Sequence, residues 1–419
     1  MDSLISPLNK GLGAFSAPVS TKEISELGWN LLREDLSLPA AVLYRDKLEH
    51  NLRWMRQFIA EYGVKLAPHG KTSMAPRLFA MQMEAGAWAI TVATAQQALV
   101  AYEHGVKRVL MANELVGKPN MAVIARLLRD PGFEFYCLVD SAAQVEQLGA
   151  YFSGFGRKLN VLVELGVEGG RAGVRNDEQL KELLDALEAH EGALALEGVE
   201  IYEGVLKEEG EIRAFLRRAC EVTAKLEAEG RFTGRPILTG AGSAWFDVVA
   251  EEFTAPSIAD KAEIVLRPGC YVTHDAGNYR EAQQRMEKTN AVACKLQPGL
   301  ETALHVWAYV QSIPEARKAI VGLGRRDAAF DSGLPVPALH YRPGNAAPAA
   351  GPGAAPAHWV VTKLMDQHGF LAIEPGDDVR VGDMIGFDIC HPCLTFDKWR
   401  VLPIVDGEYN VVDVVETYF

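Results

Sequence analysis

The stretch LAPHGKTS, residues 66–73, lies where a strand pattern gives way to a helix pattern. A β-prone run, residues 62–66, leads into it, and Met74-Ala75-Pro76 then opens a helical pattern. Lys71 is therefore predicted between a strand end and a helix. Its amine could be a nucleophile there if burial or a neighbouring positive charge lowers its pKa. The segment alone leaves open the alternative of a solvated loop lysine.

Strand and helix patterns alternate from this lysine onward. Such alternation is typical of parallel strands that are buried on both faces and joined by helical crossovers. We therefore predict an α/β fold, a (β/α)8 TIM-type barrel; periodicity leaves an open doubly wound sheet as the alternative. The eight predicted strands cover residues 64–66, 87–92, 108–112, 133–139, 159–165, 196–202, 236–239 and 264–267.

The pattern changes after residue 284, where strand patterns follow one another with few helices between them. Residues 335–356 are rich in Pro, Ala and Gly and predict a flexible surface excursion. We predict a barrel domain at residues 45–284 and a mostly β domain made of residues 1–44 and 285–419. The strands predicted in the later part cover residues 290–296, 305–313, 318–321, 359–365, 384–389, 401–405 and 408–415.

Composition excludes several classes of protein. The 419 residues are 48% hydrophobic and 23% charged, with a formal net charge of −13. The acidic balance argues against a nucleic-acid partner, because phosphate contacts need clustered Lys and Arg. No apolar run has the length of a membrane span, and residues 1–20 lack a signal-peptide pattern. Six scattered cysteines are typical of a reduced, cytoplasmic protein.

Glycine-rich segments follow two of the predicted strands, at the barrel face where function is expected. Thr239-Gly240-Ala241-Gly242-Ser243 follows the seventh strand. Its glycines allow close approach of backbone N–H groups to a phosphate, and the Thr239 and Ser243 hydroxyls can donate. A tight turn without a ligand is the alternative. Arg171 stands among glycines after the fifth strand and is either a cofactor contact or a surface arginine.

His391 and Cys393 follow the strand predicted at residues 384–389. If the chain stays extended, side chains two residues apart face the same way. An imidazole and a thiolate on one face suit Zn²⁺, and two protein ligands would leave positions open for water or substrate. A pair of ordinary β-domain residues is the alternative.

Together these segments resemble the D-serine dehydratase and D-threonine aldolase family of pyridoxal-phosphate enzymes, which share the alanine racemase barrel. The Pro-His-x-Lys-Thr motif of the family is present at residues 68–72, which marks Lys71 as the Schiff-base lysine. Ala67 stands where the family often has arginine. The resemblance further implies cofactor contacts at Arg171, Tyr202, Thr239, Gly240, Gly242, Ser243 and Gly269, and a metal pair at His391 and Cys393.

The resemblance implies pyridoxal 5'-phosphate and Zn²⁺, or another divalent metal, as cofactors. It also implies a small D-amino acid substrate and the homodimer usual in the family. We expect a lyase that converts a D-serine-like substrate to pyruvate and ammonia. The main alternative is a D-threonine aldolase, which is typically similar but with His and Asp at the metal positions; Cys393 favours dehydration. Amino-acid racemization and a non-catalytic pyridoxal-phosphate protein are further alternatives.

Overall fold

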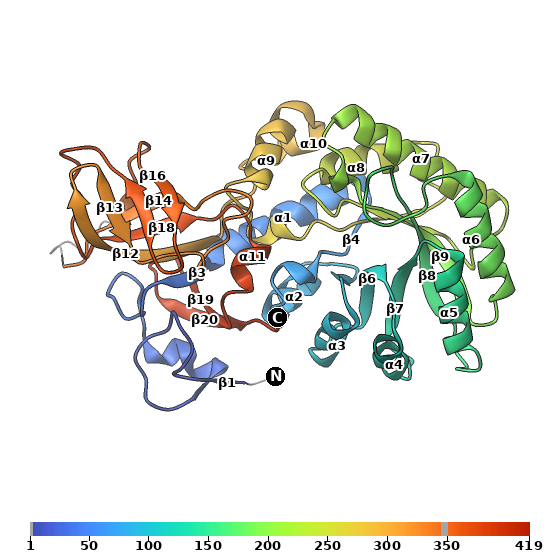
Figure 1. Cartoon of the computed structure of the whole chain (residues 1–419), viewed down its shortest axis with the longest axis horizontal. Helices are drawn as coiled ribbons and strands as arrows, with labels where there is room; N and C mark the ends of the chain where they lie inside the picture. The colour runs from blue at the N-terminus through green and yellow to red at the C-terminus, as the bar shows by residue number, and fades with distance from the viewer. Residues whose placement is uncertain (1–2, 345–350) are drawn as a thin grey trace.

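A computed structural model describes residues 3–344 and 351–419 of the chain. Figure 1 shows two regions, a ring of strands and helices built from the first two thirds of the chain and a β-rich region built mainly from the last third. No helix among the described residues combines the length and apolar character needed to cross a membrane.

The first region is a parallel eight-stranded barrel, as predicted. Its strands are hydrogen-bonded in the order β4-β11-β10-β9-β8-β7-β6-β5, and neighbouring strands are parallel. Small and branched side chains form a separate buried cluster made from these strands, including Ala67, Leu138 and Val265. The strands are β4 (Lys65–Leu66), β5 (Ile90–Val92), β6 (Arg108–Glu114), β7 (Glu134–Val139), β8 (Leu159–Leu165), β9 (Leu194–Ile201), β10 (Ile237–Gly240) and β11 (Glu263–Leu266).

The barrel closes at the segment that carries Lys71. The backbone N–H of Trp88 donates to the Leu66 carbonyl at 2.7 Å, and the N–H of Thr91 donates to the Pro68 carbonyl at 2.8 Å. The Thr91 hydroxyl adds a bond of 2.6 Å to the Ala67 carbonyl. Because these contacts join the first strand to its neighbour, the chain just before Lys71 is fixed on both sides.

Helices cover the outside of the barrel because each carries one apolar face. In α1, Leu48, Met55 and Phe58 are fully buried, while the opposite face is charged. The barrel helices are α1 (Arg45–Tyr62), α2 (Pro76–Glu84), α3 (Ala95–Glu103), α4 (Lys118–Leu127), α5 (Ala142–Phe152), α6 (Asp177–Ala189), α7 (Glu209–Ala228), α8 (Phe246–Phe253) and α9 (Asn278–Thr289).

The second region is a mainly antiparallel sheet system. Its β3 (Ala40–Tyr44) comes from before the barrel and pairs with strands from after it, β12 and β19. The other strands are β12 (Leu304–Glu315), β13 (Lys318–Val321), β14 (Val336–Tyr341), β15 (Gly353–Ala354), β16 (Val360–Leu364), β17 (Gly369–Ala372), β18 (Met384–Asp388), β19 (Val401–Val405) and β20 (Val411–Glu416).

Three local predictions are wrong or incomplete. Residues 290–296 contain the helix α10 (Ala291–Lys295) instead of a strand, because the Asn290 side chain accepts from the Val292 and Ala293 N–H groups and caps it. Residues 22–32 have a helical sequence pattern that predicts a helix, but the structure forms the shorter 3₁₀ helix η1 (Thr21–Leu27) there. The predicted surface excursion at 335–356 contains β14 and β15, and its residues 345–350 lie outside the described chain.

The two regions meet at the carboxyl ends of the barrel strands. The Ala276 N–H, in the segment after β11, donates to the Ile389 carbonyl just beyond β18 at 2.9 Å. The short helix α11 (Cys393–Phe396) contacts the 3₁₀ turn η2 (Gly70–Thr72), which contains Lys71. The predicted metal pair and the predicted nucleophile are thereby brought to one place.

Candidate active site

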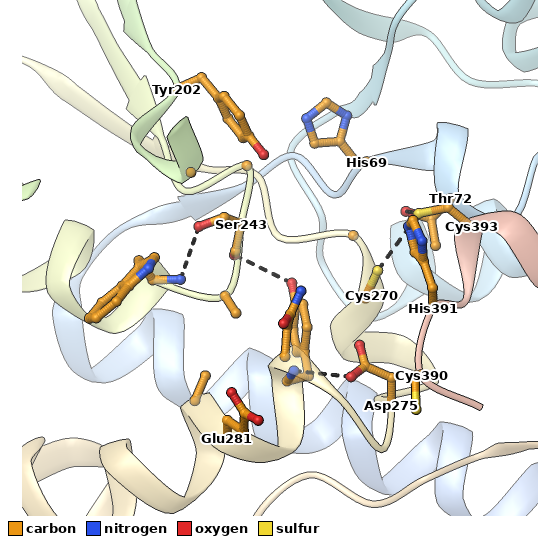
Figure 2. Close-up of a pocket in the computed structure, with 18 of the residues that line it drawn as sticks. His69, Thr72, Tyr202, Ser243, Cys270, Asp275, Glu281, Cys390, His391 and Cys393 are labelled. Atoms are coloured by element: carbon orange, nitrogen blue, oxygen red, sulfur yellow. Dashed lines mark hydrogen bonds between the residues drawn. The ribbon is translucent and has the colours of Figure 1, made fainter. Parts of the chain in front are cut away.

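A cavity of about 760 Å³ lies between the barrel mouth and the second region. Figure 2 shows side chains from both regions pointing into it. Of the predicted site residues, Lys71, Tyr202, Gly242, Ser243, Gly269, His391 and Cys393 line the cavity.

Lys71 lies in the turn that follows the barrel closure. Burial lowers the pKa of its amine, and the Arg171 and Arg267 guanidinium groups lower it further, whereas Cys393 acts in the opposite direction. Lys71 forms no ion pair with any residue of the described chain. A half-buried, unpaired lysine with a lowered pKa is the form of amine that can act as a base or nucleophile.

His69 and Tyr202 line the cavity from the barrel (Figure 2). Burial holds the pKa of His69 well below its usual range, so its ring is neutral, and its Nδ1 is buried without a hydrogen-bond partner. The Arg171 guanidinium lies 4.2 Å from the centre of the Tyr202 ring. Arg171 thus reaches the site through Tyr202 and does not itself line the cavity.

The loop that carries Arg171 is held by an arginine that the sequence analysis missed. The Arg175 guanidinium donates to the carbonyls of four consecutive residues, 170–173, and the Gly173 N–H donates to Asp140 at 3.1 Å. The only indication of this role in the sequence is that Arg175 directly follows the glycine-rich run. These bonds give an otherwise flexible segment a defined shape.

Part of the predicted phosphate turn lies at the cavity wall. Gly242 and Ser243 line the cavity, but the Ser243 hydroxyl donates to buried Glu203 at 2.7 Å. The second Glu203 oxygen accepts from the Ala241 N–H at 3.0 Å. Thr239 is buried and its hydroxyl donates to the Val265 carbonyl at 2.7 Å, so its side chain is not free for a ligand.

Glycines at this site stand where a larger residue would not fit. A Cβ on Gly269 would lie 2.5 Å from Thr72 Oγ1, and one on Gly242 would lie 2.9 Å from the Tyr202 ring. Gly240 is less tightly enclosed, with 3.3 Å to the nearest atom, and does not line the cavity. The first two glycines therefore keep the cavity wall compact around His69, Thr72 and Tyr202.

A buried ion pair stands on the barrel side of the site. Arg267 and Glu200 are 1% and 0% exposed, and the guanidinium donates to the carboxylate and to the Ile201 carbonyl. Arg267 Nε and Nη1 and the second Glu200 oxygen are buried without partners. The Arg267-Pro268-Gly269 turn was recognised in the sequence, but the pairing with Glu200 was not.

The backbone between the two predicted metal ligands differs from the extended conformation that was expected. Pro392 has helical dihedral angles and Cys393 opens α11, so the chain is not extended between His391 and Cys393. Both side chains nevertheless enter the cavity. Hydrogen bonding to Cys393 raises the pKa of His391 to about 9. The pKa of Cys393 lies well below its usual range, mainly because of its contact with Cys270 and also because of its hydrogen bond with His391.

Further polar groups surround this pair. His391 Nδ1 lies 2.7 Å from Asp331, Cys393 Sγ lies 3.5 Å from Thr72 Oγ1, and the sulfurs of Cys393 and Cys270 are 3.9 Å apart. An imidazole beside thiols is a donor set that suits zinc. Within residues 3–344 and 351–419, however, no three His, Cys, Asp or Glu side chains form a complete cluster of metal ligands.

Both regions of the chain match known protein families. Residues 43–255 match the family described as alanine racemase, N-terminal domain, and residues 303–405 match the serine dehydratase domain. The chain is 26% identical over 345 residues to a D-threonine aldolase of Arthrobacter sp., covering 81% of this chain and 80% of the aldolase. It is 32% identical over 169 residues to a D-threo-3-hydroxyaspartate dehydratase of Delftia sp. (strain HT23), covering 40% and 44%.

Solved structures agree with these matches. A D-threonine aldolase from Filomicrobium marinum superposes with a TM-score of 0.74 at 26% identity, covering 93% of this chain and 97% of that one. An alanine racemase from Bacillus anthracis shares the fold, with a TM-score of 0.59 at 16% identity over 90% of this chain and 97% of that one.

Fold and site together define an alanine-racemase-like enzyme of the pyridoxal-phosphate class. Within that class, the chain belongs to the D-serine dehydratase and D-threonine aldolase family, whose members are lyases acting on D-amino acids. Pyridoxal phosphate is expected for this family. The cavity fits it: Lys71 is unpaired, His69 Nδ1 has no partner, and the walls at Gly242 and Gly269 leave no room for a side chain.

Proposed function

We propose that the protein is a pyridoxal-phosphate- and zinc-dependent dehydratase of a β-hydroxy-D-amino acid, with D-serine as the simplest substrate. The observation that carries this proposal is the placement of Lys71 and the His391–Cys393 pair on one cavity. The first supplies a base and the second supplies metal donors, and β-elimination of hydroxide needs both functions. A homodimer and a cytoplasmic location remain predictions.

Barrel residues would hold the cofactor. Lys71 would bind it covalently, the backbone at Gly242 and Ser243 would face its phosphate, and Tyr202, backed by Arg171, would lie beside its ring. When bound, the cofactor supplies an electron-withdrawing ring that makes the substrate's α-proton removable. Glu203 holds the phosphate turn in place through Ser243 and the Ala241 N–H.

Lys71 would then take the proton at Cα. Its lowered pKa favours the neutral amine, which can accept a proton. Loss of the β-hydroxyl releases one water, and hydrolysis of the product consumes one water. D-serine is thereby converted to pyruvate and ammonia without an oxidant or reductant.

The His391–Cys393 pair would hold the metal, which supplies a Lewis acid toward the departing hydroxyl. Asp331 fixes the ring of His391 through Nδ1, leaving Nε2 for the metal. Solved structures of a D-threo-3-hydroxyaspartate dehydratase include a histidine-to-alanine variant and, two positions along, a cysteine-to-alanine variant in a metal-free form. The same residue types stand at this spacing in the present chain.

Aldol cleavage is the second candidate, and the comparisons support it better than they support D-serine as the substrate. The D-threonine aldolases match most of the chain in sequence and structure. In this reaction the β-hydroxyl loses its proton, the Cα–Cβ bond breaks, and glycine and an aldehyde are formed. The same residues would hold the metal in this reaction, and the substrate's β-hydroxyl would be deprotonated instead of expelled.

One assay separates the candidates. The purified protein, loaded with pyridoxal phosphate, is incubated with D-serine, D-threonine or D-threo-3-hydroxyaspartate, with and without a chelator. We expect a 2-oxo acid and ammonia, lost on chelation and restored by zinc. Glycine and an aldehyde would establish the aldolase instead. Unreacted substrates together with no cofactor absorbance would overturn both.

A further inference from the structure

The thiol of Cys270 lies beside the predicted metal pair and has no part in the mechanism so far. Cys270 opens the short 3₁₀ helix η4 (Cys270–Val272), directly after the turn that ends β11, and it lines the cavity. Figure 2 shows its sulfur directed toward His391 and Cys393. The residue thus belongs to the barrel, whereas the pair belongs to the second region.

We propose that Cys270 is the third protein ligand of the metal held by His391 and Cys393, completing a Cys₂His set with one position open for the substrate hydroxyl. This inference rests on the metal site of the proposed function. Catalytic zinc sites commonly have three protein ligands and one open position. His391 and Cys393 supply two such donors, and Cys270 would supply the third.

The spacing of the two sulfurs matches such a site. Zinc binds thiolate sulfur at about 2.3 Å, so two sulfurs at a tetrahedral angle lie about 3.8 Å apart. Cys270 Sγ and Cys393 Sγ are 3.9 Å apart. A metal could therefore bind both with almost no movement of either sulfur.

The backbone around Cys270 is also rigid. A Cβ on the preceding Gly269 would lie 2.5 Å from Thr72 Oγ1, and the Cys270 carbonyl accepts from the His274 N–H at 2.7 Å. On the other side, Thr72 Oγ1 lies 3.5 Å from Cys393 Sγ, and the Thr72 side chain also contacts the Cys270 thiol. Both sulfurs therefore lie against the same turn. The three side chains do not form a complete ligand cluster as they stand, so the adjustment on binding metal falls to His391, whose side chain is 30% exposed.

Neighbouring donors are already engaged elsewhere. One oxygen of Asp275 accepts from the Gly277 N–H at 2.8 Å and the Tyr279 N–H at 3.1 Å, at the start of α9. Cys390 Sγ donates to the Leu334 carbonyl at 3.3 Å. Asp331 contacts the Nδ1 side of the His391 ring. Cys270 is the donor whose sulfur lies against the sulfur of Cys393. On binding metal, its thiol proton would pass to solvent.

The test measures how many sulfur ligands the bound zinc ion has. The full chain, loaded with pyridoxal phosphate under a reductant, is stripped of metal and reconstituted with one zinc ion. X-ray absorption at the zinc edge then reports the ligands, and competition with a chelator reports affinity. Cys270→Ser is compared with Cys294→Ser, which changes an exposed cysteine. Cofactor absorbance verifies that each variant is folded. If Cys270→Ser does not fold, Cys270→Ala replaces it in the comparison.

We expect two sulfur ligands in the wild type and in Cys294→Ser, and one in Cys270→Ser with zinc affinity lowered by at least about tenfold. A single sulfur in the wild type, or an oxygen ligand such as Asp275 in place of the second sulfur, overturns the role of Cys270 and leaves the proposed elimination standing. Failure of the wild type to bind zinc overturns the metal site itself. Bound zinc with two sulfurs but no elimination supports the site and overturns the proposed reaction.

Discussion

The two sides of the cavity are built in different ways. On the barrel side, Lys71 and Tyr202 follow hydrogen-bonded parallel strands, and the Arg267–Glu200 pair beneath them is almost fully buried. On the other side, His391 and Cys393 lie on a connection after β18, and His391 is held by Asp331, whose side chain is 40% exposed. A cofactor held by the first side is tightly confined, whereas a metal held by the second has an adjustable ligand.

This difference predicts separable losses of function. Strand ends in a barrel are fixed by neighbours on both sides, so a change there affects the reacting atoms directly. A ligand on a partly exposed connection depends on its own few contacts. Variants on the two sides should therefore separate cofactor binding from metal binding, and the following predictions test that separation.

Lys71→Ala should have the largest effect. Removing the amine removes both the covalent attachment of the cofactor and the base, so we expect turnover to fall by about 10³-fold or more. The absorbance of the bound cofactor should also change. Steady-state assays and absorption spectra measure both effects. Lys118→Ala, at an exposed helix position, is the control. Unchanged spectra in Lys71→Ala would contradict the assigned attachment.

His391→Ala should abolish metal binding and leave the cofactor in place. Loss of the Lewis acid should lower the elimination rate by about 10²-fold, while cofactor absorbance stays at the wild-type level. Metal analysis and absorption spectra of the same sample check this. His358→Ala is a matched control, because His358 is also a partly exposed histidine paired with an aspartate, Asp377 at 2.8 Å. Loss of the cofactor together with the metal would break the proposed separation.

The sequence predicted the barrel side better than the other side. A buried parallel strand has a continuous apolar pattern, and the strand Leu159–Leu165 agrees with its predicted bounds to the residue. Contacts between distant segments leave no such pattern. Neither the Glu203–Ser243 hydrogen bond nor the approach of Cys270 to Cys393 could be deduced from spacing. The extended conformation expected between His391 and Cys393 was wrong because Pro392 has helical dihedral angles and α11 starts at Cys393.

Glu164→Gln tests whether water is excluded from the barrel interior around this buried carboxyl group. Burial, with Glu200 and Glu114 nearby, raises the pKa of Glu164 to about 10. The folded chain therefore keeps a proton that the unfolded chain loses above its ordinary pKa of about 4.3. The contribution of this group to stability falls as pH rises between those two values.

Glutamine cannot ionise, so Glu164→Gln should remove that part of the pH dependence. We expect equal stabilities at pH 4 and a stability advantage of the variant over the wild type that grows by about 3 kcal/mol from pH 7 to pH 9. Denaturant unfolding at each pH measures this. Glu168→Gln, an exposed position in the next loop, should follow the wild type. Parallel pH profiles for Glu164→Gln and the wild type would indicate a hydrated barrel interior.

Asp331→Asn should give the smallest effect and tests the other side most specifically. The carboxylate lies 2.7 Å from His391 Nδ1 and fixes which ring nitrogen faces the cavity. An amide of the same shape keeps a contact but loses the charge, so we expect zinc affinity to fall about tenfold. Cofactor binding should not change, because the ring contacts of Tyr202 and the turn at Ser243 lie on the barrel side. Competition with a chelator measures the first quantity and cofactor titration the second. Asp377→Asn beside His358 should alter neither. If Asp331→Asn weakened cofactor binding as strongly as zinc binding, the two sides would form one coupled unit and the contrast between them would fail.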